Sequence, residues 1–244
     1  MALDADTLIV GASAAGLATA AYLKQAGGSF EILEAREVVG NTWRHHYERL
    51  HLHTPKSGSS LPGLRMPRAW PRYPARDQVV DYLENYRARH RLSPRYDQEV
   101  IQLERRGDAW IATSRTREWS ARNVVIATGA ARRPVRPTWP GMGSYTGQML
   151  HSSEYRNGDP WIGRPVLVVG FGNSACEQAI DLLERGPSLT CRYDRRSTWC
   201  LGTCSAWFPS SGSVSRCGMS RRQLPMRWDG RSSGSRWAIS ATSA

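Results

Sequence analysis

The first 34 residues constrain the fold of this chain more than any other part of the sequence. Residues 7–10 form an apolar run with β-branched members, which is typical of a buried parallel strand, and the small residues GASAAG follow at 11–16. An alanine-rich stretch at 17–25 predicts a helix, and the apolar run 30–33 predicts a second strand that ends at Glu34. This order of strand, glycine turn, helix, strand and acid is that of the dinucleotide-binding βαβ unit.

Each position of the predicted turn has a physical role in binding a dinucleotide. Gly11 lets the chain leave the strand in a tight turn, and small Ser13, at the pattern's missing middle glycine, lets the backbone approach a pyrophosphate. The free N–H groups at the helix start, around Ala14, favour the negative charge of that group. Gly16 allows close packing of the helix on the strand. Glu34 is placed to accept hydrogen bonds from a ribose and to disfavour a 2′-phosphate.

A membrane segment or signal peptide is the alternative interpretation of this stretch, because residues 8–23 carry no charge. The stretch is short for a transmembrane helix, and the charges before it are Asp4 and Asp6 rather than basic residues. The first 190 residues contain one cysteine, Cys176. We therefore expect a cytoplasmic protein with no membrane partner.

The positive charge of the chain is concentrated at its C-terminal end. The formal net charge of +12 raises the question of nucleic-acid binding, but residues 191–244 hold nine arginines against two aspartates. Lys24 and Lys56 are the only lysines of the sequence, so the excess of arginine indicates G/C-rich coding rather than a binding surface. We expect no nucleic-acid partner, and the 40% of hydrophobic residues permits a folded core.

The rest of the first 140 residues predicts an α/β domain with a small antiparallel insertion. Residues 44–75 lack periodicity and become proline-rich, which predicts an extended surface loop, and residues 76–91 carry the apolar stripe of a helix. Three strand-like runs follow, of which the first two fit an antiparallel pair and the third returns to the parallel sheet: 99–103, 110–113 and 124–127.

Four histidines, at positions 45, 46, 51 and 53, raise the alternative of a metal site. Their spacing lacks the framed i, i+4 pair of a zinc-protease helix, and no cysteine or carboxylate pair accompanies them. We therefore predict no metal and expect one or two of these side chains to line a pocket.

A second nucleotide turn is predicted after residue 165. Residues 165–169 form an apolar strand-like run, and GFGNSA at 170–175 leads into a helical stretch through Leu183. Ala175 replaces the last glycine of the pattern, which packing of helix on strand tolerates. We therefore expect contacts to a second dinucleotide from Gly170, Gly172, Asn173 and Ser174.

Over about residues 7–186 the chain resembles the flavin-containing monooxygenases, in the branch that includes the plant YUCCA-type enzymes. The resemblance rests on both glycine turns and on shared motifs: LEA at 33–35, GNTW at 40–43, YERLHLHTPK at 47–56, ATG at 127–129, and the fingerprint Tyr145-x-Gly147-xxx-His151-xxx-Tyr155. It implies a Rossmann-like FAD-binding domain followed by the start of a Rossmann-like NADPH-binding domain. The FAD contacts that it implies are Gly11, Ser13, Ala14, Gly16, Glu34, Gly40, Trp43, Thr128 and Gly129.

The resemblance also implies an activity. In the family, NADPH reduces FAD, and a flavin hydroperoxide then transfers one oxygen atom of O2 to a small substrate, such as a soft heteroatom, a ketone or a 2-oxo acid. Because the flavin supplies the chemistry, we assign no catalytic acid or base. A purely structural role stays open for Trp43 and for His151. The oligomeric state also stays open.

A flavin disulfide reductase shares the plan of two nucleotide sites and is the rival enzyme. It needs a redox cysteine pair just after the FAD acid, and residues 40–54 contain no cysteine. This alternative is therefore disfavoured.

We predict three parts: an FAD-binding domain at 1–140, the first βαβ part of an NADPH-binding domain at 141–186, and an irregular tail at 187–244. The tail is rich in Ser, Arg, Cys and Trp and shows neither strand nor helix periodicity, which is unusual for a folded domain. Its four cysteines form no CxxC pair, which disfavours zinc, and an arginine-rich RNA-binding tail is a further alternative.

A change of reading frame near residues 187–191 explains the tail best. When the codons of 190–208 and 225–240 are read in a shifted frame with G/C-biased third bases, they give regular strand- or helix-like sequences. The chain is then a truncated monooxygenase. An inactive FAD-domain fragment with a disordered tail is the alternative function.

Overall fold

The computed structural model describes residues 3–129, 133–170, 172–185 and 189–192. All of them belong to one compact unit, which spans residues 1–206. The predictions made for residues 193–244, including disorder, a frame change, zinc binding and RNA binding, lie outside the described residues. The division into domains at residue 140 stays a prediction.

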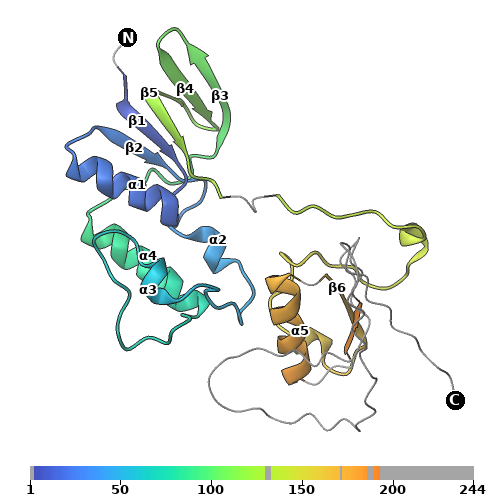
Figure 1. The fold of residues 1–244 in the computed structure, drawn as a ribbon. Helices are drawn as coiled ribbons and strands as arrows, with labels where there is room; N and C mark the ends of the chain where they lie inside the picture. Colours follow the sequence, from blue (N-terminus) through green and yellow to red (C-terminus); the bar gives the residue numbers. More distant parts are fainter. Residues whose placement is uncertain (1–2, 130–132, 171, 186–188, 193–244) are drawn as a thin grey trace, which may run out of the picture. The chain divides into compact units, whose positions relative to one another are not determined.

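A five-stranded sheet organises the first half of the chain (Figure 1). Its strand order is β2-β1-β5-β4-β3, and β1 pairs in parallel with both β2 and β5. The pairs β3–β4 and β4–β5 are antiparallel, so the predicted insertion is confirmed as a continuation of the same sheet. The strands are β1 Ala5–Val10, β2 Phe30–Leu33, β3 Val100–Arg106, β4 Ala109–Ser114 and β5 Glu118–Ile126.

Strand β5 begins well before the strand predicted at 124–127. Its first half pairs with β4, where Trp119 lies opposite Ala112, and its second half pairs with β1, where Val124 lies opposite Leu8. The first half was missed because polar residues interrupt its apolar pattern. Ser120 is buried, and its N–H and hydroxyl both donate 2.8 Å hydrogen bonds to the carboxylate of Asp4.

Of the two longer helices of this half, α1 (Ala14–Gln25) packs on β1 and β2, and α4 (Arg76–Arg89) packs against α1 (Figure 1). Successive β1 residues point to opposite faces, so Ile9 enters the core under these helices, whereas Leu8 joins a smaller core with Trp119 and Ala121. The main core consists of small and medium apolar residues with two tyrosines: Ile9, Ala12, Leu17, Ala20, Ala21, Ile32, Val39, Met66, Val79, Tyr82, Leu83, Tyr86 and Leu92.

Residues 44–75 are less extended and less superficial than predicted. The single-turn helix α2 (Asn41–Arg44) ends where this segment begins, and a second single-turn helix, α3 (Lys56–Ser59), lies within it. The side chain of Met66 is buried. The tyrosine hydroxyls of α4 fix the proline-rich part, because Tyr82 donates to the carbonyl of Leu64 at 2.6 Å and Tyr86 donates to that of Pro62 at 2.8 Å. Each hydrogen bond gives a donor to a loop carbonyl that is not paired within a helix or a strand.

The second half contains a further parallel pair of strands, β6 (Val166–Val169) and β7 (Leu189–Arg192), connected by helix α5 (Asn173–Arg185). Two 3-10 turns precede it, η1 (Met142–Ser144) and η2 (Asp159–Trp161). Strand β7 lies inside the range 187–244 that was predicted as an irregular tail. The strand was missed because the residues LTCR at 189–192 form no apolar run like those of β2 and β6, and its pairing partner β6 lies more than 20 residues earlier in the chain.

Within the described residues no helix is long and apolar enough to cross a membrane.

Candidate functional site

The first glycine turn lies at the carboxyl end of β1, against the end of β5. Gly11 has a φ of 110°, and a Cβ placed there would approach the carbonyl oxygen of Ala127 to 2.6 Å. A Cβ at Gly16 would approach the carbonyl oxygen of Gly11 to 1.9 Å. No side chain fits at either position, so both glycines are required for the turn as the sequence predicted.

Helix α1 begins directly after this turn. Ser13 is its N-cap residue and makes no side-chain capping bond, and the first turn of the helix holds no acidic residue. The backbone N–H groups around Ala14 therefore keep the positive end of the helix dipole without a carboxylate from the protein. This arrangement suits a pyrophosphate, whose oxygens accept hydrogen bonds from such groups.

Glu34 directly follows β2 and lies beside the same turn. Its carboxylate is 9% exposed and accepts hydrogen bonds from the backbone N–H of Ala12 at 2.7 Å and of Arg36 at 3.1 Å. These bonds fix the carboxylate at the mouth of the turn. A carboxylate has about four lone-pair positions, so acceptor capacity remains for the hydroxyls of a ribose.

Two further predicted segments lie against the first turn. Gly40 has a φ of 64°, caps α2 and donates its N–H to the carbonyl of Ala12 at 3.1 Å. Gly129 has a φ of 78°, and Cα of the preceding Thr128 would lie 3.5 Å from a Cβ at Gly11. Trp43 is half-buried and packs on two buried clusters, as expected for the alternative of a core aromatic. Its contact with a cofactor stays a prediction.

The second glycine turn joins β6 to α5. Gly170 has a φ of 129°, and a Cβ there would make an ordinary 3.6 Å contact with that of Ala175, so the backbone conformation rather than crowding favours glycine at this position. Gly172 precedes the first helical residue and accepts the N–H of Cys176 at 3.1 Å. The side-chain amide of Asn173 donates to Nδ1 of His53 at 2.9 Å, so part of its capacity is used within the protein.

Sequence reasoning did not connect the histidine-bearing segment 45–53 with this second turn. Nε2 of His53 lies 3.1 Å from Oε1 of Glu177 on α5, and Arg49 forms an ion pair with Glu184 further along the helix. Four buried side chains pack together where the segment contacts α5: Tyr47, Leu50, Tyr155 and Leu182. No local pattern in the sequence signals contacts between residues so far apart in the chain.

The other histidines make local contacts. Nδ1 of His45 lies 2.8 Å from the carbonyl of Asn41, and Nδ1 of His51 lies 2.6 Å from that of Arg49. Burial, together with the charges of Arg156 and Arg76, lowers the pKa of His46. Among the described residues no three His, Cys, Asp or Glu side chains gather in a way that could hold a metal ion.

The fingerprint residues 145–155 contribute an anchor for α5. The hydroxyl of Tyr155 is buried and donates to Oδ2 of Asp181 at 2.6 Å, while Nε of Arg185 donates to Oδ1 at 3.2 Å. Nδ1 of His151 lies 2.8 Å from the hydroxyl of Ser153, which fits the structural alternative for this histidine. Tyr145 is exposed.

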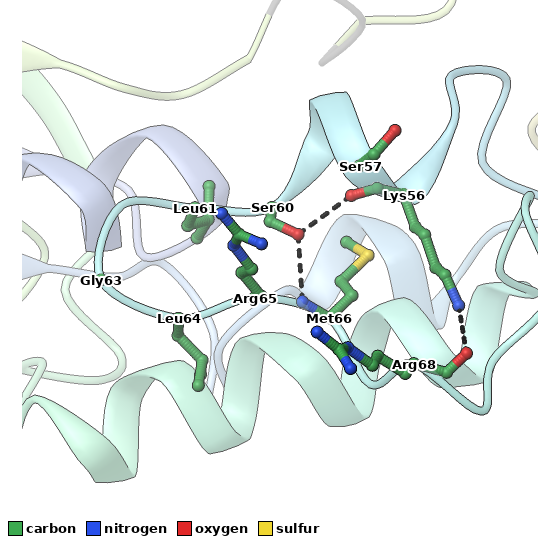
Figure 2. A pocket seen from close by; sticks show the side chains of 9 residues that line it. All are labelled: Lys56, Ser57, Ser60, Leu61, Gly63, Leu64, Arg65, Met66 and Arg68. Atoms are coloured by element: carbon green, nitrogen blue, oxygen red, sulfur yellow. Dashed lines mark hydrogen bonds between the residues drawn. The ribbon is translucent and has the colours of Figure 1, made fainter.

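A hollow of about 760 Å³ lies in the loop between α3 and α4 (Figure 2). Lys56 is used structurally there, because its Nζ donates to the carbonyls of Pro67 at 3.0 Å and Arg68 at 2.8 Å. Ser60 accepts the N–H of Met66 at 3.0 Å and donates to the carbonyl of Lys56 at 2.9 Å (Figure 2). The guanidinium of exposed Arg65 gives the hollow a cationic rim.

Comparison with known proteins identifies the family. Residues 8–202 match the family described as "Pyridine nucleotide-disulphide oxidoreductase". The chain belongs to this family. The match extends past residue 186, where the resemblance found in the sequence ended. The family description names disulphide chemistry, but residues 40–54 of this member contain no cysteine.

The proteins similar to this chain include flavin monooxygenases. It is 39% identical to indole-3-pyruvate monooxygenase YUCCA4 of Oryza sativa subsp. japonica over 193 residues, which cover 72% of this chain and 44% of the relative. It is 37% identical to the uncharacterized CzcO-like oxidoreductase of Geobacillus kaustophilus (strain HTA426) over 179 residues. These residues cover 73% of this chain and 51% of the relative. This member thus spans about half the length of the curated relatives that it matches.

A solved structure supports the same relationship. The flavin-containing monooxygenase from Stenotrophomonas maltophilia superposes on this family member with a TM-score of 0.72 and 32% sequence identity. The superposition covers 76% of this chain and 56% of the other. The α/β fold with a Rossmann-like nucleotide-binding unit is therefore confirmed.

Proposed function

We propose that this chain is the nucleotide-binding portion of an FAD- and NADPH-dependent monooxygenase, which transfers one oxygen atom of O2 to a small organic substrate. One observation supports this most strongly. Two glycine turns each end a parallel strand and begin a helix, and the first has a buried carboxylate, Glu34, fixed at its mouth.

The residues of the first turn fit FAD. A Cβ at Gly11 or Gly16 would clash with a backbone oxygen of the protein, so the two glycines keep the turn tight, and the first turn of the helix offers N–H groups and holds no acidic residue. Glu34 would accept hydrogen bonds from the adenosine ribose. When bound, the flavin supplies the redox chemistry, and the task of the protein is to bind, to orient and to exclude water.

The second turn would hold NADPH through the backbone around Gly170 and Gly172 and through Ser174. A substrate of moderate size is proposed because the relatives named indole-3-pyruvate monooxygenase act on a small molecule. The alternative is a fragment that binds FAD but catalyses no reaction. It is favoured by the exposure of Leu167 and Val169 on β6, 52% and 40%, which leaves apolar surface open.

A matched pair of variants tests the two sites separately. Ser13→Asp and Gly172→Asp each place an aspartate immediately before a helix, where it is a favourable N-cap and where its charge repels a phosphate. In the unaltered chain we expect added FAD to raise the midpoint of thermal unfolding and NADPH to bleach the flavin anaerobically. Ser13→Asp should abolish the FAD shift, and Gly172→Asp should retain it but stop the bleaching.

The outcomes separate the two functions. Oxidation of NADPH that consumes O2 and yields an oxygenated product supports the monooxygenase. Stabilisation by FAD without bleaching by NADPH supports the fragment that binds FAD but catalyses no reaction. A thermal melt that is insensitive to FAD in the unaltered chain contradicts both.

A further inference from the structure

Two polar atoms inside the contact between segment 45–53 and α5 are buried without a hydrogen bond of good geometry among the described residues. They are the hydroxyl of Tyr47 and Oε2 of Glu177, and the hydroxyl lies beside the side chains of both Glu177 and Ser174. Tyr47 is 2% exposed, and its pKa is raised by burial and by the neighbouring Glu177 carboxylate. Buried polar atoms normally find partners, so this pair requires a physical reason.

The other oxygen of Glu177 belongs to a chain of polar contacts that reaches the second glycine turn. Oε1 lies 3.1 Å from Nε2 of His53, whose Nδ1 receives the amide of Asn173 at 2.9 Å. An amide nitrogen can only donate, so Nδ1 of His53 accepts and Nε2 carries the hydrogen that is donated to Glu177. The contacts thus fix both the ring orientation and the tautomer of His53.

This chain of contacts connects the two nucleotide turns. Asn173 is the first residue of α5, directly after the second turn. His53 and Tyr47 follow α2, whose N-cap Gly40 donates its N–H to Ala12 of the first turn. His53 and Glu177 therefore lie on a route of chain and hydrogen bonds between the two turns.

We propose that Glu177 and His53 are positioning residues that couple the two nucleotide turns, so that occupation of the second turn strengthens binding at the first. This inference rests on the proposed function, because it requires a ligand at each turn. It gives a reason for the carboxylate beside the buried hydroxyl, since Oε1 of Glu177 contacts His53.

The coupling is measurable as the ratio of the FAD dissociation constants without and with saturating NADP+, using the 244-residue chain and flavin fluorescence. We expect a ratio of about 5 to 10 for the unaltered chain, within the usual range for coupled sites. Glu177→Leu should lower the ratio to about 1 while FAD affinity without NADP+ changes less than about twofold. Glu177→Gln keeps an acceptor for His53 and should restore most of the ratio.

Glu184→Gln is the matched control. Glu184 also connects α5 to the segment, through Arg49, but it lies away from the second turn. It should leave the ratio unchanged. His53→Leu should cause the same loss as Glu177→Leu, and the double variant no further loss, because both break one connection. A ratio that survives Glu177→Leu, or that falls equally with Glu184→Gln, overturns the proposal.

A second measurement does not depend on variants or on cofactor. Nitrogen NMR of the unaltered chain should show His53 as the Nε2–H tautomer. The Nδ1–H tautomer overturns the contacts themselves. Failure of the unaltered chain to bind FAD instead overturns the proposed function and the coupling, while the tautomer still tests the contacts.

Discussion

The backbone N–H of Ala12 donates a 2.7 Å hydrogen bond to Oε2 of Glu34, which joins the turn after β1 to the acid that directly follows β2. The other oxygen of the carboxylate accepts the N–H of Arg36. The acid is therefore oriented by the backbone before any nucleotide arrives, and a preorganised group loses less entropy on binding. The geometry of the first site depends on this connection.

Glu34→Gln tests the contribution of the negative charge at this position. The amide oxygen can still accept the N–H of Ala12, but the amide nitrogen cannot accept that of Arg36, and hydrogen bonds from a ribose to a neutral acceptor are weaker. We expect the dissociation constant for FAD to rise about tenfold, equivalent to about 1.4 kcal/mol, as measured by flavin fluorescence. Glu31→Gln, on the same strand and paired with Arg95 at the surface, is the control and should bind FAD normally. Equal affinities for all three proteins would contradict a role for Glu34.

Gly16→Ala tests the steric requirement of the turn. The new Cβ would lie 1.9 Å from the backbone oxygen of Gly11, which cannot move like the end of a flexible side chain. We expect the free energy of unfolding to fall by about 1–3 kcal/mol, as for other overpacked sites, measured by urea denaturation. Gly58→Ala is the matched control because nothing lies within 4 Å of its Cβ position in helix α3. It should be neutral or slightly stabilising, and a similar loss in both variants would show that crowding is not the cause.

The parts of the fold that the sequence predicted are those with a local pattern. Strand β2 was predicted to the residue, and the positions of Gly11 and Gly16 follow from turn geometry, because apolar runs and glycine spacing act over a few residues. The contact of His53 with Glu177 spans 124 positions and leaves no such pattern. The start of β5 was missed for a related reason. The polar groups of buried Ser120 find their hydrogen-bond acceptor in Asp4, which lies 116 positions earlier in the chain.

Tyr155→Phe tests the buried anchor of α5. The substitution removes the 2.6 Å hydrogen bond to Asp181, a carboxylate that is only 4% exposed and would lose a donor in a buried position. We expect the free energy of unfolding to fall by about 1–3 kcal/mol. The control is Tyr145→Phe at the other aromatic position of the fingerprint, which is 60% exposed and should leave stability unchanged. If Tyr155→Phe were also neutral, the hydrogen bond would not be an anchor.

The pH dependence of stability should include a contribution from Asp4. Burial alone would raise the pKa of its carboxyl, but hydrogen bonds from Ser120 and the guanidinium of Arg117 outweigh burial and lower it below 3.8. A lowered pKa in the folded state stabilises the protein above the unfolded value, and this contribution is lost as the pH falls through the folded value.

Asp4→Asn should therefore destabilise the protein at neutral pH, and the difference from the unaltered chain should shrink between about pH 5 and pH 2. Urea unfolding at a series of pH values measures this difference. Asp6→Asn provides the comparison, because Asp6 lies two residues further along the chain, in β1, and pairs with Arg122 at an exposed position, where such pairs contribute little. A pH-independent difference for Asp4→Asn would mean that the loss comes from the shape of the side chain rather than from its ionisation.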